Sequence, residues 1–139
     1  MTRYVAGLAF SRGLGHVALI RKQRPEWQAG KLNGIGGHVE PGESTYEAMV
    51  REFREETGVL VEDWNFFAVL YGHGWVVFWY WTKIDLSALG SPTDETVEIV
   101  DSELTVPGVI PNLHWIVPMA INDIRGVGRC PFYEINESK

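Results

Sequence analysis

The sequence predicts an α+β domain in which a sheet packs against at least one strongly marked helix. Several apolar runs of strand length surround one helix that has a sequence signal at each end. The 139 residues, 45% of them hydrophobic and 22% charged, suit one globular unit, and no internal repeat or linker divides them. We therefore expect a single domain over residues 1–139.

The first two strands are expected at residues 3–10 (RYVAGLAF) and 16–22 (HVALIRK). The turn SRGLG separates these apolar runs, and its glycines break regular structure. A polar loop follows at residues 23–31. The glycines of residues 32–40 (LNGIGGHVE) argue against a helix in that stretch.

A helix is predicted for Thr45–Thr57. Ser44 and Glu47 have the spacing of a capping box at its start, and Gly58 stands where a left-handed cap ends a helix. An apolar stripe of this helix is expected to pack on the sheet. It consists of Tyr46, Met49, Val50 and Phe53.

The second half of the chain is expected to add strands and a second helix. Residues 61–72 and 74–84 should pair around the tight turn YGHG, and residues 97–100 (VEIV) should form another short strand. A helix is predicted over residues 111–124. Pro118 should lie near an end of it or cause a kink, because proline has no backbone N–H to donate. The last ten residues, CPFYEINESK, carry no clear signal.

The charge balance argues against some partners. The net charge is −6 and no long Lys or Arg run is present, so the chain is a poor candidate for binding a nucleic acid polymer. A small anionic ligand is compatible with this balance if metal ions screen it. The longest apolar stretch, GWVVFWYW, is too short to span a membrane. Nothing selects between a monomer and a homodimer.

The cellular compartment is inferred from cysteine usage and the first residues. Cys130 is the one cysteine, so no intramolecular disulfide can form, which suits a reducing compartment. The start, MTRYVAGLAFSRG, has too short an apolar run for a secretory signal. We therefore expect a cytoplasmic protein in which Cys130, with no motif near it, is chemically inert.

Three acids crowd one side of the predicted helix. Glu52, Glu55 and Glu56 fall within an arc of roughly 100° beside the apolar stripe. Carboxylates that close raise one another's pKa unless a cation binds. Mg²⁺ takes oxygen ligands and brings substrate phosphates into its remaining positions. An acid-rich helix face can also be an ordinary solvated surface. The residues around the helix are needed to distinguish such a surface from a metal site.

The wider pattern is G-x5-E-x7-R-E-U-x-E-E-x-G-U over residues 37–59, where U is a bulky apolar residue. It resembles the Nudix box, the signature of the Nudix hydrolases. Its seven fixed identities should arise by chance on the order of once in 10⁸ start positions at average composition. The only departure is Phe53, where Leu, Ile or Val is more usual. The order of elements also resembles the family's α/β/α sandwich with a mixed sheet.

The resemblance implies hydrolysis of a nucleoside diphosphate linked to another group, with Mg²⁺ or Mn²⁺ as cofactor. Carried over by position, the three box acids named above are the catalytic metal ligands, joined by the carbonyl of Gly36. Arg51 belongs to the same catalytic group, and its expected role is a structural pair with Glu43 that fixes the loop on the helix. Such a site neutralises phosphate charge and orients water for attack on phosphorus.

A further carboxylate from outside the box often completes the metal site of this family or acts as a base. The stretch SPTDETVEI offers Glu95 as the first candidate and Glu98 as the second. Both are equally compatible with an ordinary place on the surface.

The substrate is predicted from weaker similarities. KLNGIGGHVEPGES resembles the MutT-type branch, which acts on nucleoside and deoxynucleoside triphosphates, including oxidised guanine nucleotides. Asn33 is then a candidate for contacting the purine, or a turn residue before Gly34. PNLHWIVP resembles a segment P-D-D-x-x-W-x-P of the mammalian oxidised-purine enzymes. Asn112 and Leu113 replace its two base-recognising acids, which puts that specificity in doubt.

Further substrate contacts are expected from His38 and from tryptophans. His38 is placed to approach a phosphate, although an ordinary solvated loop histidine fits the same position. Most tryptophans are expected in the core, as aromatic residues of strands usually are. The candidates for stacking on a base are Trp27, Trp75, Trp79, Trp81 and Trp115.

Three functions are therefore compared. The first is a pyrophosphohydrolase that releases a nucleoside monophosphate and pyrophosphate from an NTP or dNTP. The second hydrolyses ADP-ribose, a dinucleoside polyphosphate or a similar nucleoside diphosphate derivative. The third, of another class, is a Nudix module that binds a nucleotide for regulation without catalysis. That module would need degraded metal carboxylates, whereas the box here is intact.

Overall fold

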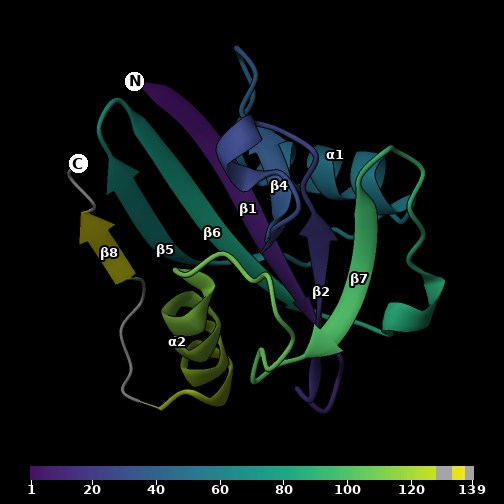
Figure 1. Ribbon diagram of the computed structural model, residues 1–139. Helices are drawn as coiled ribbons and strands as arrows, with labels where there is room; N and C mark the ends of the chain where they lie inside the picture. The colour runs from purple at the N-terminus through teal and green to yellow at the C-terminus, as the bar shows by residue number, and fades with distance from the viewer. Residues whose placement is uncertain (128–132, 137–139) are drawn as a thin grey trace.

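The computed structural model of the chain describes residues 1–127 and the backbone of residues 133–136 (Figure 1). Within that part, the strands are β1 (Thr2–Phe10), β2 (His16–Arg21), β3 (Leu32–Asn33), β4 (Ile35–His38), β5 (Asn65–Gly72), β6 (Trp75–Lys83), β7 (Thr96–Asp101) and β8 (Tyr133–Asn136). The helices are α1 (Thr45–Thr57) and α2 (Leu113–Arg125), and the short 3-10 segments are η1 (Glu26–Gln28) and η2 (Leu86–Ala88). No helix among these is long and apolar enough to cross a membrane.

The sheet is mixed, as predicted. Its central path has the order β3-β2-β1-β6-β5-β8, with β4 pairing to β1 and β7 pairing to β2. Strands β1 and β6 run parallel, and so do β5 and β8, whereas the other pairs are antiparallel. The predicted hairpin is present, because β5 and β6 pair up to Gly72 and Trp75 around the YGHG turn.

The two helices cover opposite faces of the sheet (Figure 1). Successive side chains of a strand point to opposite faces. Val5 of β1 therefore packs in the core that contains Met49 and Phe53 of α1. Leu8 of the same strand packs in the second core, with Leu113 of α2. The expected α/β/α sandwich is confirmed, and α1 carries the box acids on one of its outer layers.

The capping signals of α1 are confirmed. Ser44 Oγ accepts the Glu47 N–H at 3.0 Å, and the Glu47 carboxylate accepts the Ser44 N–H at 2.9 Å. Gly58 ends the helix in the left-handed conformation, with φ of 80°. These contacts satisfy backbone groups that a helix end leaves without partners. They fix both ends of the segment that carries the box.

The predicted apolar stripe of α1 is wrong at Tyr46. Its side chain is 41% exposed, and its hydroxyl donates to the Glu62 carbonyl at 2.6 Å. Ala48, rather than Tyr46, belongs to the buried face with Met49. The small side chain at Ala48 suits a helix that lies close to the sheet, whereas the phenol is large and has a polar end that favours the surface.

Several elements differ from the prediction. The glycine-rich stretch, where the sequence argued only against a helix, forms β3 and β4, and the unassigned tail contains β8. Strand β5 begins four residues late because Trp64 turns inward, packs on Phe53 at 5.0 Å between ring centroids and donates to the Val61 carbonyl. Pro118 lies inside α2 rather than near an end, which leaves the predicted kink as the remaining alternative. Cys130 falls outside the described residues.

The pairing of β4 with β1 depends on a glycine. A Cβ at Gly36 would lie only 1.9 Å from the Val5 carbonyl oxygen. The two backbones therefore approach at a distance that any side chain would prevent. This contact holds β4, which contains the start of the box at Gly37, against the central strand of the sheet.

The close approach predicts a stability effect. Gly36→Ala should lower the free energy of unfolding by more than about 2 kcal/mol, because the neighbouring atoms are backbone and cannot rotate away. Urea unfolding followed by tryptophan fluorescence measures it. Gly13→Ala is the matched control, since a Cβ there meets nothing within 4 Å, and it should change stability by less than about 0.5 kcal/mol. Equal unfolding midpoints for the two variants would contradict the observed β1–β4 packing.

Candidate active site

Arg51 lies at the centre of the acidic surface of α1. Its Nε and one terminal nitrogen donate to the two carboxylate oxygens of Glu43, at 2.7 and 3.0 Å. The same terminal nitrogen donates to the His38 carbonyl at 3.0 Å. The other terminal nitrogen donates to Glu52 at 2.9 Å and to Glu55 at 3.3 Å. The expected contact with Glu43 is present, and Arg51 also links two of the box acids.

The surroundings shift the pKa values of these acids in opposite directions. Hydrogen bonds from Arg51 lower the pKa of Glu43. The Glu52 side chain is only 12% exposed, and this burial raises its pKa more than the Arg51 contact lowers it. A raised pKa means that the surroundings stabilise the anion incompletely. Additional positive charge near Glu52 is therefore favourable.

Gly37 provides the space that Glu52 occupies. A Cβ at Gly37 would lie 2.6 to 2.7 Å from the carboxyl atoms of Glu52. The carboxylate of α1 thus packs directly against the backbone of β4. A side chain at Gly37 would displace it, which explains in physical terms why the box begins with glycine.

Glu56 is half-buried one helical turn beyond Glu52. The Thr93 hydroxyl donates to its Oε1 at 3.1 Å. Burial raises the pKa of Glu56, and the negative charges of Glu95 and Glu52 raise it further, while Thr93 and Lys22 lower it. These mutual effects place the three carboxylates in one charged neighbourhood.

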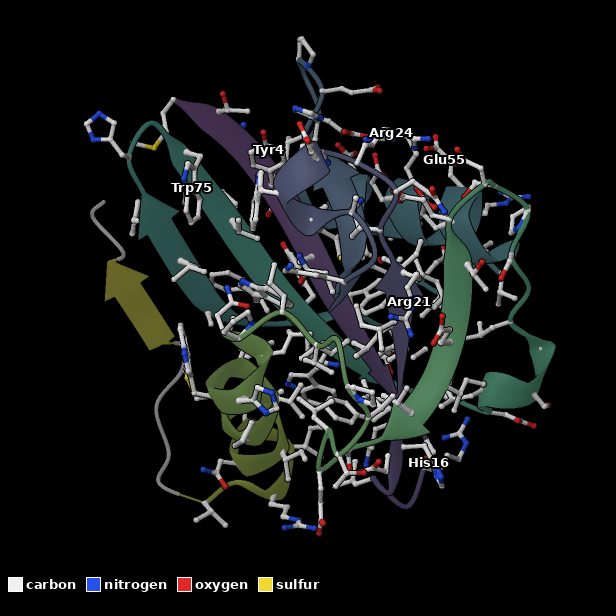
Figure 2. The ribbon with its side chains drawn as sticks, in the orientation of Figure 1. Tyr4, His16, Arg21, Arg24, Glu55 and Trp75 are labelled. Carbon is white, nitrogen blue, oxygen red and sulfur yellow. The ribbon has the colours of Figure 1, made fainter. Side chains whose placement is uncertain are left out.

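Glu95 is a buried acid outside the box, with 3% of its surface exposed. The Gln23 N–H donates to its Oε2 at 2.7 Å, and Lys22 Nζ donates to its Oε1 at 3.1 Å. Burial by itself raises the pKa of Glu95, but these hydrogen bonds outweigh it and the net pKa is lowered. Arg24 adds an ion pair at 3.7 Å. Figure 2 shows Arg24 at the same end of the molecule as Glu55.

Glu98, the second candidate, has a different partner. Its two carboxylate oxygens accept from Arg21 at 2.7 and 2.8 Å, and this hydrogen bonding lowers its pKa. Glu98 of β7 thus forms a bidentate ion pair with Arg21 of the neighbouring strand β2. The roles predicted for Glu95 and Glu98 stay predictions, and the charge coupling to Glu56 favours Glu95.

The box acids do not form a ready-made metal cluster. Across residues 1–127, no three Asp, Glu, His or Cys side chains are grouped as ligands of one ion. Arg51 occupies oxygens of Glu52 and Glu55, and Thr93 holds Glu56. Glu55, at 55% side-chain exposure, is the acid most free to reorient.

The donor chemistry nevertheless fits a hard divalent cation. The candidate ligands are all oxygen atoms, which Mg²⁺ and Mn²⁺ prefer. Glu52 fills the space left by the missing Cβ of Gly37, and burial raises the pKa values of both Glu52 and Glu56. Gly36, whose carbonyl is the fourth expected ligand, precedes Gly37 in β4. That these groups bind a cation stays a prediction.

Two of the predicted substrate residues, Asn33 and Asn112, come from adjacent segments. Asn33 of β3 donates to Gln28 Oε1 at 2.8 Å and accepts the Gly34 N–H at 2.8 Å. Leu32 beside it accepts from Ile110, so β3 runs along the segment that leads to α2. Asn112 is the residue before α2, and its buried Oδ1 has no hydrogen-bond partner within the described structure.

The remaining candidates differ in exposure. The His38 ring lies 4.6 Å from the Tyr4 ring, between centroids, and is exposed. Trp79, one of the stacking candidates, is buried in the core, whereas Trp27 is 65% exposed. Trp81 donates to Asp123 at 2.8 Å. Trp75 is partly buried, and Trp115 is exposed.

A surface groove of about 630 Å³ runs along the outer side of α1. Arg51 and Glu55 belong to its wall, and Tyr46, Val50 and Leu60 supply apolar surface. Part of the acidic network is therefore accessible to a ligand from solvent.

Some residues of this neighbourhood were not predicted from the sequence. Lys22, Gln23 and Thr93 lie outside the box and belong to loops far from it in the chain. Only the folding of the sheet brings the loop after β2 and the loop before β7 beside α1. No local pattern signals these residues, although Thr93 stands two positions before the predicted Glu95.

The comparison with family models identifies the chain. The model of the NUDIX domain matches residues 1–114, and the chain therefore belongs to the NUDIX family. The enzyme class that the box implies, a hydrolase acting on pyrophosphate bonds, is the class of this family. A search of curated proteins gave no match.

Solved structures agree on the fold. A MutT studied from Aliivibrio salmonicida and Vibrio cholerae is 23% identical, with a TM-score of 0.73 over 88% of this chain and 98% of that one. A NUDIX hydrolase from Nitrosomonas europaea is 19% identical, with a TM-score of 0.78 over 99% of this chain and 79% of that one. A MutT protein from Methanosarcina mazei Go1 is 19% identical, with a TM-score of 0.70 over 92% and 96%.

The Arg51 contacts predict a difference between two neighbouring arginines. Arg51→Ala should lower the free energy of unfolding by about 1–3 kcal/mol, because the partly buried carboxylates of Glu43 and Glu52 lose their positively charged partner. Arg54→Ala is the matched control on the exposed side of the same helix and should cost less than about 0.5 kcal/mol. Urea unfolding of both variants is the measurement. Equal losses would show that Arg51 contributes no more than a surface charge.

Proposed function

We propose that the chain is a MutT-type pyrophosphohydrolase that uses Mg²⁺ or Mn²⁺ to cleave an NTP or dNTP into a nucleoside monophosphate and pyrophosphate. The observation that carries the proposal is the complete box on α1, with Glu52 packed against Gly37 and Arg51 tying the helix to the segment before it. Oxidised purine nucleotides belong to the proposed substrate class. The MutT proteins among the similar structures support the MutT-type branch by analogy, because they share the fold.

The proposed ligands of the cation are Glu52, Glu55 and Glu56, with the carbonyl of Gly36. When bound, the cation supplies neutralisation of phosphate charge and activation of the attacking water. Arg51 keeps Glu52 and Glu55 on the same side of α1 while its bonds to the preceding segment hold the helix in place. Rigid support of this kind preserves the geometry that an in-line displacement needs.

Glu95 is proposed as the further carboxylate, either as a base or as another ligand. Its charge acts on Glu56, which supports a place at the same site, whereas Glu98 is paired with Arg21. The lowered pKa keeps Glu95 ionised near neutral pH. A water molecule at the site would compete with Lys22 and Gln23 for its oxygens.

The nucleotide contacts are proposed for Asn33, Asn112 and His38. The unpartnered Asn112 Oδ1 supports a role in binding, because a buried polar atom without a partner is costly unless a ligand or water satisfies it. Exposed Trp27 remains a stacking candidate. The proposed partner is a small nucleotide rather than a nucleic acid polymer, and the protein is proposed to act in the cytoplasm as a monomer or homodimer.

The experiment that tests the proposal is a hydrolysis panel with product identification. It covers the common NTPs and dNTPs, oxidised dGTP, ADP-ribose and a diadenosine polyphosphate, with and without Mg²⁺. Mg²⁺-dependent release of monophosphate and pyrophosphate from a triphosphate is expected. Preference for ADP-ribose or the dinucleotide would overturn the substrate class but keep the reaction type. Tight binding of one compound without turnover would instead indicate the regulatory module.

Glu55→Gln gives the matched mutational test of the same panel. Turnover should fall by more than about 100-fold. Removing a residue that only orients a metal ligand typically costs about 10–100-fold in activity, and removing the ligand itself should cost more. The melting temperature should stay unchanged because Glu55 is exposed. Glu62→Gln, an acid along the same groove, should keep full activity. Normal Mg²⁺-dependent turnover by Glu55→Gln would remove Glu55 from the ligand set.

Base recognition by Asn33 predicts a change of preference rather than a general loss. Asn33→Ala should alter the ranking of nucleotides by kcat/KM, because an amide that pairs with a base edge discriminates between bases. Gln28→Ala is the comparison, since it removes the internal partner of Asn33 but keeps its amide. A uniform loss for all nucleotides in both variants would assign Asn33 to shaping the loop.

A further inference from the structure

We propose that Thr93 is a positioning residue that orients the Glu56 carboxylate for cation binding through the hydrogen bond between their side chains. The inference rests on the proposed function, because it requires that Glu56 is a ligand of the cation. Thr93 lies 37 positions from Glu56 in the chain and outside the box. The contact comes from the loop between η2 and β7.

The hydrogen bonding around Thr93 gives its hydroxyl a direction. A hydroxyl has one proton and two lone pairs. The Glu95 N–H donates to Thr93 Oγ1 at 3.1 Å and so occupies a lone pair. A carboxylate can only accept, so the Thr93 proton is available to Glu56 Oε1 at 3.1 Å. The other acceptor in reach, the Glu95 carbonyl, is more distant at 3.4 Å.

The loop that carries Thr93 is anchored on both sides. Before it, the Gly90 N–H donates to the carbonyl of Thr57, the last residue of α1, at 2.9 Å. After it, the buried Glu95 carboxylate accepts hydrogen bonds from the Gln23 N–H and from the side chain of Lys22, the residue that follows β2. Thr93 is therefore held between α1 and β2, and its hydroxyl keeps a defined position relative to Glu56.

This arrangement restricts a side chain that would otherwise rotate. Glu56 has three rotatable bonds, and only its Oε1 contacts Thr93. The hydrogen bond leaves Oε2 as the oxygen available to a cation. Partners that orient a metal ligand in this way commonly contribute 10–100-fold to metal affinity. Because Thr93 is exposed to solvent, we expect the lower end of that range.

The test is a Mn²⁺ titration of the metal-free protein, with free Mn²⁺ measured by electron paramagnetic resonance. Thr93→Val keeps the shape of the side chain but removes the hydroxyl, and should raise the Kd for Mn²⁺ about tenfold. Thr93→Ser keeps the hydroxyl and should stay within about twofold of the wild type. Thr96→Val, an exposed threonine on β7, is the matched control and should not change the Kd. Without metal, Thr93→Ser and Thr96→Val should melt like the wild type, whereas Thr93→Val should melt slightly lower because the Glu95 N–H loses its acceptor.

Glu56→Gln separates the possible failures. If Glu56→Gln weakens Mn²⁺ binding but Thr93→Val does not, the role of Thr93 is overturned and the proposed site stands. If Glu56→Gln binds Mn²⁺ like the wild type, the proposed cation site is overturned and this inference with it. If both Thr93 variants lose affinity together with melting temperature, Thr93 is only a structural residue of the loop, which also overturns the proposal.

Discussion

The repulsion among carboxylates on one end of a helix is the constraint on which the rest of this site depends. Three glutamates of α1 lie close to one another, and one of them is largely buried. Arg51 offsets part of this repulsion, and its planar group reaches Glu43, Glu52, Glu55 and the His38 carbonyl at once. A lysine could not make these parallel contacts. The compensation is incomplete, as the raised pKa of Glu52 indicates.

The second requirement is close contact between backbones. Gly36 allows β4 to lie against β1, and Gly37 leaves the space in which Glu52 rests. Together with Arg51 these contacts join the helix, the preceding loop and the sheet into one rigid support. The ligands proposed for the cation are therefore held both by Arg51 of their own helix and by contacts with β4 and the Thr93 loop.

A second side of the candidate site is formed by two loops, one after β2 and one before β7. Glu95 and Thr93 reach the acidic cluster from the loop before β7, and Lys22 reaches it from the end of β2. Lys22 brings a positive charge and Thr93 a hydrogen-bond donor to this surface, whereas Glu95 adds a further negative charge. The segments that carry Asn33 and Asn112 lie side by side, because the backbone of Leu32 forms hydrogen bonds with Gly108 and Ile110. A nucleotide that uses both regions would have to extend from α1 to the segment before α2.

By itself, the sequence determined the helix from Thr45 to Thr57, its two caps, the main strands and the box that identifies the family. These features are local, because caps, periodicity and spacing act within a few residues of the chain. Tertiary structure alone decided the short strands β3, β4 and β8, the inward turn of Trp64 and the outward position of Tyr46. It also decided the partners of Glu95 and Glu56. Those outcomes depend on which distant segments pair across the sheet, and no local pattern carries that information.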